Sequence, residues 1–389
     1  MRDFVNRKSK LLQPSGIRKF FDIVRETEGA ISLGVGEPDF VTPWPIRSAA
    51  IASLQRGYTQ YTANRGMRPL LELIARYLEA RFSLSFDPAH ILVTVGASEA
   101  IDLTLRACVE PGDEVLLPDP SYVSYAPCVA LSDGVPVKVE CREEDGFRLT
   151  PQRLEAAITD KTKAIILTYP NNPTGAVMEE TALKQIAEII EKHDLLVISD
   201  EIYAELTYGG RHASLASLPG MKKRTAYIGG FSKAFAMTGW RLGYAIAPQH
   251  LMDRIKQFHD FNTVGAPSVL MEAAIAGLEM PDSYYEEFGA HYAHMKALFT
   301  KGLDDIGIQY TDPQGAYFVL ANIGQYLKPG QTDVEFCEEM ARKVGVACVP
   351  GTSFFKENVN DIIRVHFAKK DDTLMEALNR LADIKTKMA

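Results

Sequence analysis

The regular alternation of short apolar segments with segments of helical length constrains the fold of this chain most strongly. The apolar segments are rich in branched residues and occupy residues 90–95, 114–118, 135–139, 162–170, 195–201, 224–230 and 242–247. Most are separated by helical patterns such as PLLELIARYLEARF and EETALKQIAEIIEKH. Strands this apolar are typically buried on both faces, and their alternation with helices indicates an α/β fold with a mainly parallel sheet.

After about Pro281 the pattern changes. A long helical stretch is followed by the segments GIQYT, AYFVLANI, VACVP and IIRVHFA, with another helical segment among them. A chain of 389 residues is also too long for one small core. We therefore expect a large α/β domain and a smaller α+β domain.

Composition excludes several classes of protein. The formal net charge is −8 and the lysines and arginines are scattered, so we expect no nucleic-acid partner. The opening MRDFVNRKSK lacks the apolar run of a secretory signal, and no run of eighteen apolar residues occurs. We expect a cytoplasmic protein without a membrane partner.

The cysteines and histidines indicate no metal site. The five cysteines form no C-x-x-C pair, which argues against both a disulfide framework and a zinc knuckle. His291 and His294 are three residues apart on a predicted helix, but the sequence places no third ligand beside them. We expect these histidines on a solvated face and no bound metal.

Two strand ends carry polar groups that fit either a connection or a ligand site. Gly96, Ala97 and Ser98 join a strand to a helix, where unpaired N–H groups attract phosphate, although every α/β protein contains such junctions. YPNNPTG at residues 169–175 is a strand-to-helix connection or a place where asparagine donors face a crevice. GVGEPDF lacks the third glycine of a dinucleotide motif, which disfavours a nicotinamide fold.

Charged residues stand in apolar surroundings at three places. Asp200 ends an apolar strand, and a buried carboxylate there needs a cation or capping donors. Lys233 is surrounded by Phe, Ala and Met, and a desolvated lysine becomes a nucleophilic amine that forms an imine with a carbonyl. The guanidinium of Arg241 could bind a phosphate. Arg364, within IIRVHFA, could bind a carboxylate, or it could point outward from an edge strand.

Six segments in this order carry a family resemblance: GASEAID, DPSY, NNPTG, SDEIY, SKAFAMTGWRLG and RVHFA. Together they resemble the class I/II aminotransferases of fold type I, and within these the aspartate/aromatic subgroup. The resemblance covers nearly the whole chain. It implies a seven-stranded large domain at residues 46–280 that binds pyridoxal 5′-phosphate. It also implies a small domain, formed by residues 1–45 and 281–389, that closes over the substrate.

The resemblance also implies roles toward the cofactor. Lys233 matches the lysine that bonds covalently to the cofactor and later moves a proton, and Asp200 matches the partner of the pyridine nitrogen. Tyr122 matches the residue that stacks on the ring. Asn172 and Tyr203 match the donors to the phenolic oxygen.

Further positions match phosphate and substrate ligands. The phosphate ligands would be the backbone of Ala97 and Ser98, the side chains of Ser232 and Arg241, and Tyr61 from the neighbouring subunit of a homodimer. Arg364 matches the residue that binds the substrate α-carboxylate, helped by Asn172 and the backbone of Gly36.

Donor specificity depends on other positions. Ser98 stands where some aspartate-preferring members have a lysine, which argues against aspartate as the donor. Ile17 and Val35 are expected in the pocket wall and would accept an aromatic or aliphatic side chain, while Arg18 is either a distal cation or a surface residue.

We predict an aminotransferase that moves nitrogen from an aromatic amino acid, aspartate or a related donor to a 2-oxo acid such as 2-oxoglutarate. The alternatives are a C–S β-lyase or decarboxylase on the same fold, or an aminotransferase for alanine or an N-acyl-diaminopimelate. A regulator that has lost turnover is disfavoured because the chain leaves no room for a DNA-binding module ahead of the fold.

Overall fold

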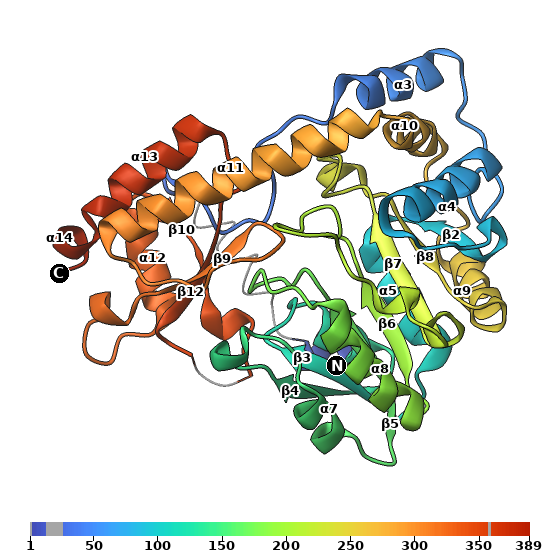
Figure 1. Cartoon of the computed structure of the whole chain (residues 1–389), viewed down its shortest axis with the longest axis horizontal. Helices are drawn as coiled ribbons and strands as arrows, with labels where there is room; N and C mark the ends of the chain where they lie inside the picture. The colour runs from blue at the N-terminus through green and yellow to red at the C-terminus, as the bar shows by residue number, and fades with distance from the viewer. Residues whose placement is uncertain (1, 13–25, 357–358) are drawn as a thin grey trace.

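The large sheet runs through the centre of the molecule. The computed structural model describes residues 2–12, 26–356 and 359–389. The strands of this sheet are β2 (Ile91–Thr94), β3 (Glu114–Asp119), β4 (Val135–Glu140), β5 (Thr162–Thr168), β6 (Leu196–Asp200), β7 (Thr225–Gly230) and β8 (Gly243–Ile246). In the described part of the chain they form one seven-stranded sheet in the order β2-β8-β7-β6-β5-β3-β4. The predicted apolar segments therefore all become strands of one sheet (Figure 1).

The direction of the strands determines where polar side chains can meet. β8 pairs antiparallel with both β2 and β7, and every other pair in the sheet is parallel. This confirms the predicted mainly parallel sheet. The carboxyl ends of β3, β5, β6 and β7 consequently lie at one edge, where open α/β sheets bind their ligands.

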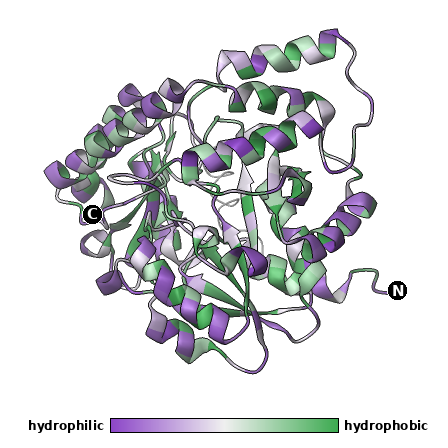
Figure 2. Cartoon of the chain, turned by 45° about the vertical axis from the view of Figure 1, so that its right-hand side comes forward, coloured by the Kyte–Doolittle hydropathy of each residue, from purple (hydrophilic) through white to green (hydrophobic). Residues whose placement is uncertain are grey.

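The helices between residues 44 and 278 lie around this sheet, and those at residues 44–55 and 268–278 pack mainly on each other. The helices of this range are α3 (Trp44–Gln55), α4 (Arg68–Phe82), α5 (Gly96–Cys108), α6 (Tyr125–Leu131), α7 (Pro151–Ala157), α8 (Glu180–Lys192), α9 (Gln249–Asn262) and α10 (Ser268–Leu278), and the short α1 (Arg7–Leu11) precedes them. In α8 the buried residues Leu183, Ile186 and Ile190 repeat at helical spacing. Figure 2 shows the same pattern more widely, with hydrophilic colour on the outward helix faces and hydrophobic colour on the central strands.

A second group of elements contains the C-terminal part of the chain. Its helices are α11 (Asp282–Ile306), α12 (Asp333–Lys343), α13 (Asp371–Ala382) and α14 (Ile384–Met388). β11 (Val349–Pro350), β12 (Ile362–His366) and β9 (Phe318–Asn322) form an antiparallel sheet, and β1 (Ile31–Ser32) pairs parallel with β10 (Val346–Ala347). The segment VACVP thus divides into two short strands. GIQYT contributes a single bridge from Tyr310 to Ala321 instead of a strand.

The buried apolar side chains form separate clusters. One cluster joins Leu33 to side chains between residues 292 and 388, and it also includes Tyr203 and Leu206. The others lie almost entirely between residues 46 and 285. On the basis of this distribution we propose two domains. Residues 46–280 form the large domain, and residues 1–45 together with 281–389 form the small one.

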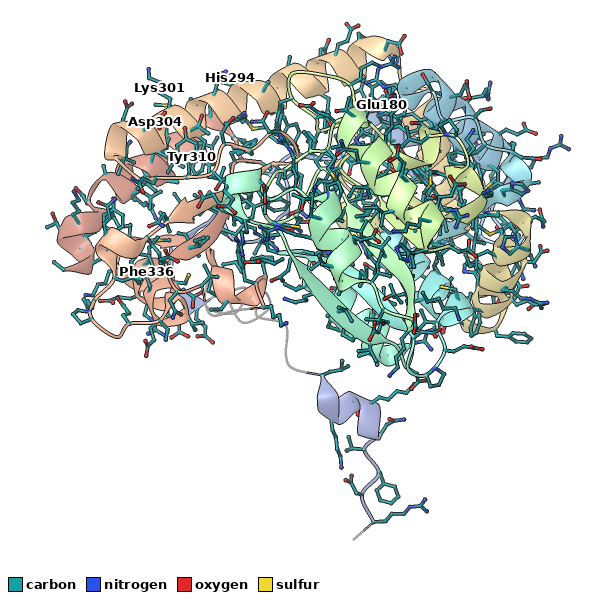
Figure 3. The ribbon with its side chains drawn as sticks, turned by 60° about the horizontal axis from the view of Figure 1, so that its bottom comes forward. Glu180, His294, Lys301, Asp304, Tyr310 and Phe336 are labelled. Carbon is teal, nitrogen blue, oxygen red and sulfur yellow. The ribbon has the colours of Figure 1, made fainter. Side chains whose placement is uncertain are left out.

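Neither a metal cluster nor a membrane-spanning helix occurs in the described residues. No group of three His, Cys, Asp or Glu side chains there could hold a metal ion. His294 lies on the exposed surface of α11, where its Nε2 is 2.9 Å from Asp371 Oδ2 (Figure 3). Among the described helices, none combines the length and apolar character needed to cross a bilayer.

Replacing Phe299 by alanine should destabilise the protein. Phe299 on α11 is fully buried in the cluster that contains Leu33. Deletion of such a ring leaves a cavity, so we expect the free energy of unfolding to fall by about 3–5 kcal/mol. Phe4→Ala is the matched control, because that ring is 83% exposed. Equal denaturation midpoints for the two variants would contradict the packing described above.

Candidate active site

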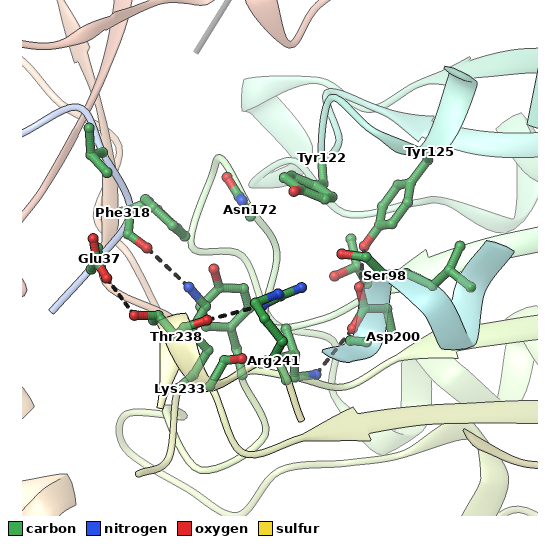
Figure 4. Close-up of a pocket in the computed structure, with 18 of the residues that line it drawn as sticks. Glu37, Ser98, Tyr122, Tyr125, Asn172, Asp200, Lys233, Thr238, Arg241 and Phe318 are labelled. Atoms are coloured by element: carbon green, nitrogen blue, oxygen red, sulfur yellow. Dashed lines mark hydrogen bonds between the residues drawn. The ribbon is translucent and has the colours of Figure 1, made fainter. Parts of the chain in front are cut away.

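A cavity of about 370 Å³ opens at the carboxyl edge of the large sheet. The predicted site residues that line it are Gly36, Ala97, Ser98, Tyr122, Asn172, Asp200, Tyr203, Ser232, Lys233, Arg241 and Arg364, together with Val35. They come from sequence positions more than 300 residues apart (Figure 4). The fold therefore assembles groups that the sequence presents separately.

Lys233 follows β7 and reaches toward the N-terminal segment. Its Nζ donates a hydrogen bond of 3.0 Å to the carbonyl oxygen of Gly36. The same Nζ lies 5.6 Å from the ring centre of Tyr203 and 5.7 Å from that of Tyr317. Burial lowers the pKa of Lys233 to about 8, and Arg364 also lowers it while Glu37 opposes the shift. At pH 7 about a tenth of this side chain is therefore a free amine, far more than for a lysine of ordinary pKa.

Asp200 is the last residue of β6 and is 5% exposed. Its carboxylate accepts hydrogen bonds from the hydroxyl of Tyr125, at 2.7 Å, and from the backbone N–H of Ile202, at 3.3 Å. Burial raises the pKa of Asp200 to about 6, although both hydrogen bonds oppose the shift. The described residues give Asp200 hydrogen bonds but no ion pair, so a cationic ligand group would favour its charged form.

Two glycines bring the start of α5 close to Arg241. A Cβ on Gly96, which has φ +75°, would lie 2.5 Å from Nη2 of Arg241. A Cβ on Gly243 would lie 2.5 Å from the backbone N of Ala97. The first backbone N–H groups of a helix lack partners within the helix. The guanidinium of Arg241 and the N–H groups of Ala97 and Ser98 consequently form a place where an anion can bind.

Arg364 on β12 is almost completely buried and lacks an acidic partner among the described residues. Its Nη1 donates to Asn172 Oδ1 at 2.7 Å and its Nη2 to the carbonyl oxygen of Gly34 at 2.5 Å, whereas its Nε has no hydrogen-bond partner. The guanidinium lies between the rings of Phe318 and Phe354, at 4.4 and 4.7 Å from their centres. Burial lowers the pKa of Arg364 to about 10. A bound carboxylate would compensate this buried charge.

Several cavity residues escaped the sequence analysis. Tyr125 stands three positions after Tyr122, and nothing in that spacing indicates that its hydroxyl bonds to Asp200. Phe318 contacts Arg364, and Glu37 accepts a hydrogen bond of 2.5 Å from the hydroxyl of Thr238. Glu37 lies in GVGEPDF, where the sequence analysis expected only Val35 and Gly36 at the site.

Two predicted site residues are not among the described residues that line this cavity. Tyr61 is 92% exposed and lines a separate hollow with residues 264–268. Its predicted contact with the phosphate of a neighbouring subunit therefore stays a prediction. Ile17, with Arg18, lies outside the described residues.

The family of the protein follows from comparison with known sequences. Residues 28–381 match the family described as aminotransferase class I and II. The chain belongs to this family. Members of the family are generally pyridoxal-phosphate-dependent, which agrees with the predicted enzyme class and fold.

Similar proteins extend over nearly the full length of this aminotransferase. It is 46% identical over 382 residues to the provisionally named aminotransferase YugH of Bacillus subtilis (strain 168), with 98% of each chain covered. It is 38% identical over 379 residues to aromatic-amino-acid aminotransferase 2 of Thermococcus litoralis, with 96% of each chain covered. A structure of a single mutant of Thermus thermophilus aspartate aminotransferase matches with a TM-score of 0.91 and 33% identity, covering 99% of this chain and 100% of the other.

Replacing Asp200 by asparagine should stabilise the cofactor-free aminotransferase at neutral pH. The pKa of Asp200 lies at about 6 in the folded protein, above its ordinary value of 3.8. The folded state therefore holds this proton more tightly than the unfolded chain, and its stability falls as pH rises from about 4 to about 6. We expect Asp200→Asn to raise the free energy of unfolding by roughly 2–3 kcal/mol at neutral pH.

Denaturant titrations from about pH 4 to about pH 7 would measure this effect. The gain should shrink toward the acidic end, where the wild-type carboxyl is protonated too. Asp305→Asn, on the exposed side of α11, serves as the control with no pH-dependent gain. The difference in unfolding free energy between Asp200→Asn and the wild type should vary with pH. A constant difference over this range would contradict the raised pKa of Asp200.

Proposed function

We propose that this aminotransferase moves the amino group of an L-amino acid to a 2-oxo acid such as 2-oxoglutarate, by a ping-pong mechanism with pyridoxal 5′-phosphate in the cytoplasm. The donor would be an aromatic amino acid, aspartate or a related compound. One observation carries the proposal: Lys233, Asp200, Arg241 and Arg364 line the same cavity. Each of these charged groups suits a different part of a cofactor-bound amino acid.

The cavity residues fit the cofactor group by group. When bound, pyridoxal 5′-phosphate acts as an electron sink for the Cα of the amino acid. The amine of Lys233 would bond to the aldehyde, and Asp200 would hold a proton on the ring nitrogen. Arg241 with the N–H groups of Ala97 and Ser98 would bind the phosphate, helped by the hydroxyl of Ser232.

The ring itself has matching neighbours. Asn172 uses Oδ1 to accept from Arg364, which leaves its Nδ2 to donate to the phenolic oxygen. Tyr203 lines the same cavity, and its hydroxyl would donate to that oxygen as well. Tyr122, held at an edge-on contact with Tyr125, would cover one face of the ring.

Arg364 would hold the α-carboxylate of the amino acid. Because Phe318 and Phe354 fix its guanidinium plane, the carboxylate would bind in one orientation. Lys233, whose Nζ is held by the carbonyl oxygen of Gly36, would move a proton at the Cα once its amine is free. Closure of the proposed small domain, residues 1–45 with 281–389, would exclude water from this step.

The lining supports an aromatic or aliphatic donor more than aspartate. Within the described lining the cationic side chains are Lys233, Arg241 and Arg364, and each already has a role. Ser98 offers no charge where some aspartate-preferring members have lysine. Val35 and Phe318 add apolar surface.

Exposed apolar residues support a homodimer. Trp44 and Leu54 on α3 are 61% and 57% exposed, and Tyr61 and Phe261 exceed 90%. Large apolar side chains exposed together commonly mark an interface. In such a dimer the side chain of Tyr61 would extend across the interface and contact the cofactor phosphate bound by the partner subunit.

An aspartate at position 261 should weaken this dimer. A charge at the centre of an apolar interface is costly, so Phe261→Asp should raise the dimer dissociation constant at least about tenfold. Sedimentation velocity over a dilution series measures that constant. Met375→Asp, at a half-exposed position on α13, is the control and should dimerise as the wild type does. A wild-type chain that stays monomeric and fully active would refute the shared site.

Lys233→Ala should abolish turnover and covalent attachment of the cofactor. Borohydride treatment of the wild type with pyridoxal 5′-phosphate should label one lysine, found at position 233 by peptide mass spectrometry. Lys301→Ala removes an exposed lysine of α11 and should leave labelling and turnover unchanged (Figure 3). Labelling of another lysine in the wild type would overturn the assignment.

An amino acid added without an oxo-acid acceptor separates transamination from lyase chemistry. An aminotransferase stops with the nitrogen on the cofactor and releases one equivalent of oxo acid. Release of pyruvate and ammonia over many turnovers would favour the C–S β-lyase instead. A panel of donors with 2-oxoglutarate then identifies the preferred amino acid.

A further inference from the structure

A buried pair of titratable side chains lies behind the start of α5, outside the cavity. His259 on α9 is 0% exposed, and its Nδ1 is 3.2 Å from Oε1 of Glu99. Its Nε2 is 3.1 Å from the backbone carbonyl oxygen of Asn64. A neutral imidazole has only one N–H, whereas both ring nitrogens here face oxygen atoms. The pair must therefore hold a second proton, either on His259 or on Glu99.

Glu99 connects this pair to the turn that precedes α5. Its Oε2 accepts a hydrogen bond from the backbone N–H of Val95, and its Oε1 accepts one from the hydroxyl of Thr263. Val95 directly precedes Gly96, whose carbonyl oxygen accepts a hydrogen bond of 3.0 Å from Thr94 Oγ1. The orientation of the 95–98 turn, which presents the N–H groups of the proposed phosphate site, thus depends on Glu99.

The other end of the pair holds the segment that contains Tyr61. Besides its carbonyl contact with His259, Asn64 donates through Nδ2 to Asp260 Oδ1 at 2.9 Å. Lys256 neutralises Asp260 at 2.7 Å. Asn64, at the end of the 59–64 segment, therefore contacts α9 at two points, and α9 is in turn joined to α5 through Glu99.

We propose that His259 and Glu99 are positioning residues for phosphate binding, because the proton shared between them holds the 95–98 turn and the 59–64 segment in place together. The proposal rests on the proposed function of this site. It assigns a task to two residues that make no contact with the cavity.

Loss of the shared proton would leave the Nδ1 lone pair of His259 facing a carboxylate. The charge on Glu99 would then be uncompensated within one helical turn of a bound dianion. With the proton in place, the pKa of Glu99 is held below its ordinary value, since hydrogen bonds from His259, Thr263 and Val95 outweigh the effect of burial.

The other charged groups near the pair have partners of their own. Asp260 and Lys256 on α9 bind each other, and Arg65 donates to the carbonyl oxygens of Ile91 and Pro88. Arg241 and Lys233 lie on the cavity side of α5. If the pH dependence of anion binding is lost when His259 is replaced, we therefore attribute that dependence to the His259–Glu99 pair.

Sulfate binding to the cofactor-free full chain tests this proposal, because sulfate stays a dianion across the neutral range. Calorimetry from about pH 6 to about pH 9 should show the wild-type affinity falling about tenfold or more, with contributions from the pair and from Lys233. His259→Gln should bind sulfate about tenfold more weakly than the wild type at pH 6 and equally well at pH 9.

Two controls separate this inference from the proposed function. Arg241→Met should abolish sulfate binding, and an unchanged affinity would refute the phosphate site itself. His193→Gln removes another histidine that is bonded to a glutamate, Glu155 at 2.9 Å, and should match the wild type at every pH. If Arg241→Met loses sulfate while His259→Gln matches the wild type throughout, the pair has no positioning role.

Glu99→Gln keeps the test decisive if His259→Gln does not fold. Without the carboxylate charge, sulfate affinity at pH 9 should exceed that of the wild type, and the part of the pH dependence that belongs to the pair should vanish. A residue needed only for general stability would instead lower the affinity by the same factor at all pH values. That uniform loss in either variant would overturn the proposal.

Discussion

The parallel pairing of β3, β5, β6 and β7 is the constraint on which this site depends. Parallel strands end at one edge of a sheet, so the residues at the carboxyl end of each strand lie beside those at the ends of its neighbours. Tyr122 comes after β3, Asn172 after β5 and Lys233 after β7, while Asp200 ends β6. The antiparallel strand β8 adds Arg241 at its start, because Gly243 lets it approach α5.

Desolvation gives these groups their chemical character. Burial lowers the pKa values of Lys233 and Arg364 and raises that of Asp200, so one physical cause shifts three groups away from their charged forms. The described protein supplies Asp200 and Arg364 with hydrogen bonds but no counter-ion. A ligand that brings a cationic ring N–H and a carboxylate would restore both charges, and the proposed cofactor and amino acid supply these two groups.

Much of this was predictable because it rests on local pattern. Apolar runs identified the seven strands, and unusual charges in apolar surroundings pointed to Asp200, Lys233 and Arg364. Side chains that act through tertiary contacts were missed: Tyr125 and Phe318 look like ordinary core aromatics in the sequence, and His259 and Glu99 lie 160 residues apart. GIQYT, one of the segments expected in the α+β domain, forms a single bridge at Tyr310 instead of a strand, and its pattern does not reveal this outcome.

The sequence by itself determined the secondary structure of the large sheet, the family and the chemical types of the site residues, because periodicity and residue identity are local properties. Only the tertiary structure decided which groups meet. Arg364 reaches Asn172 and Gly34 across 192 and 330 residues, and those contacts depend on β12 lying beside the end of β5 and the segment at Gly34 in the folded chain. Burial, and with it the shifted pKa values, exists only once distant segments have excluded water from the same cavity.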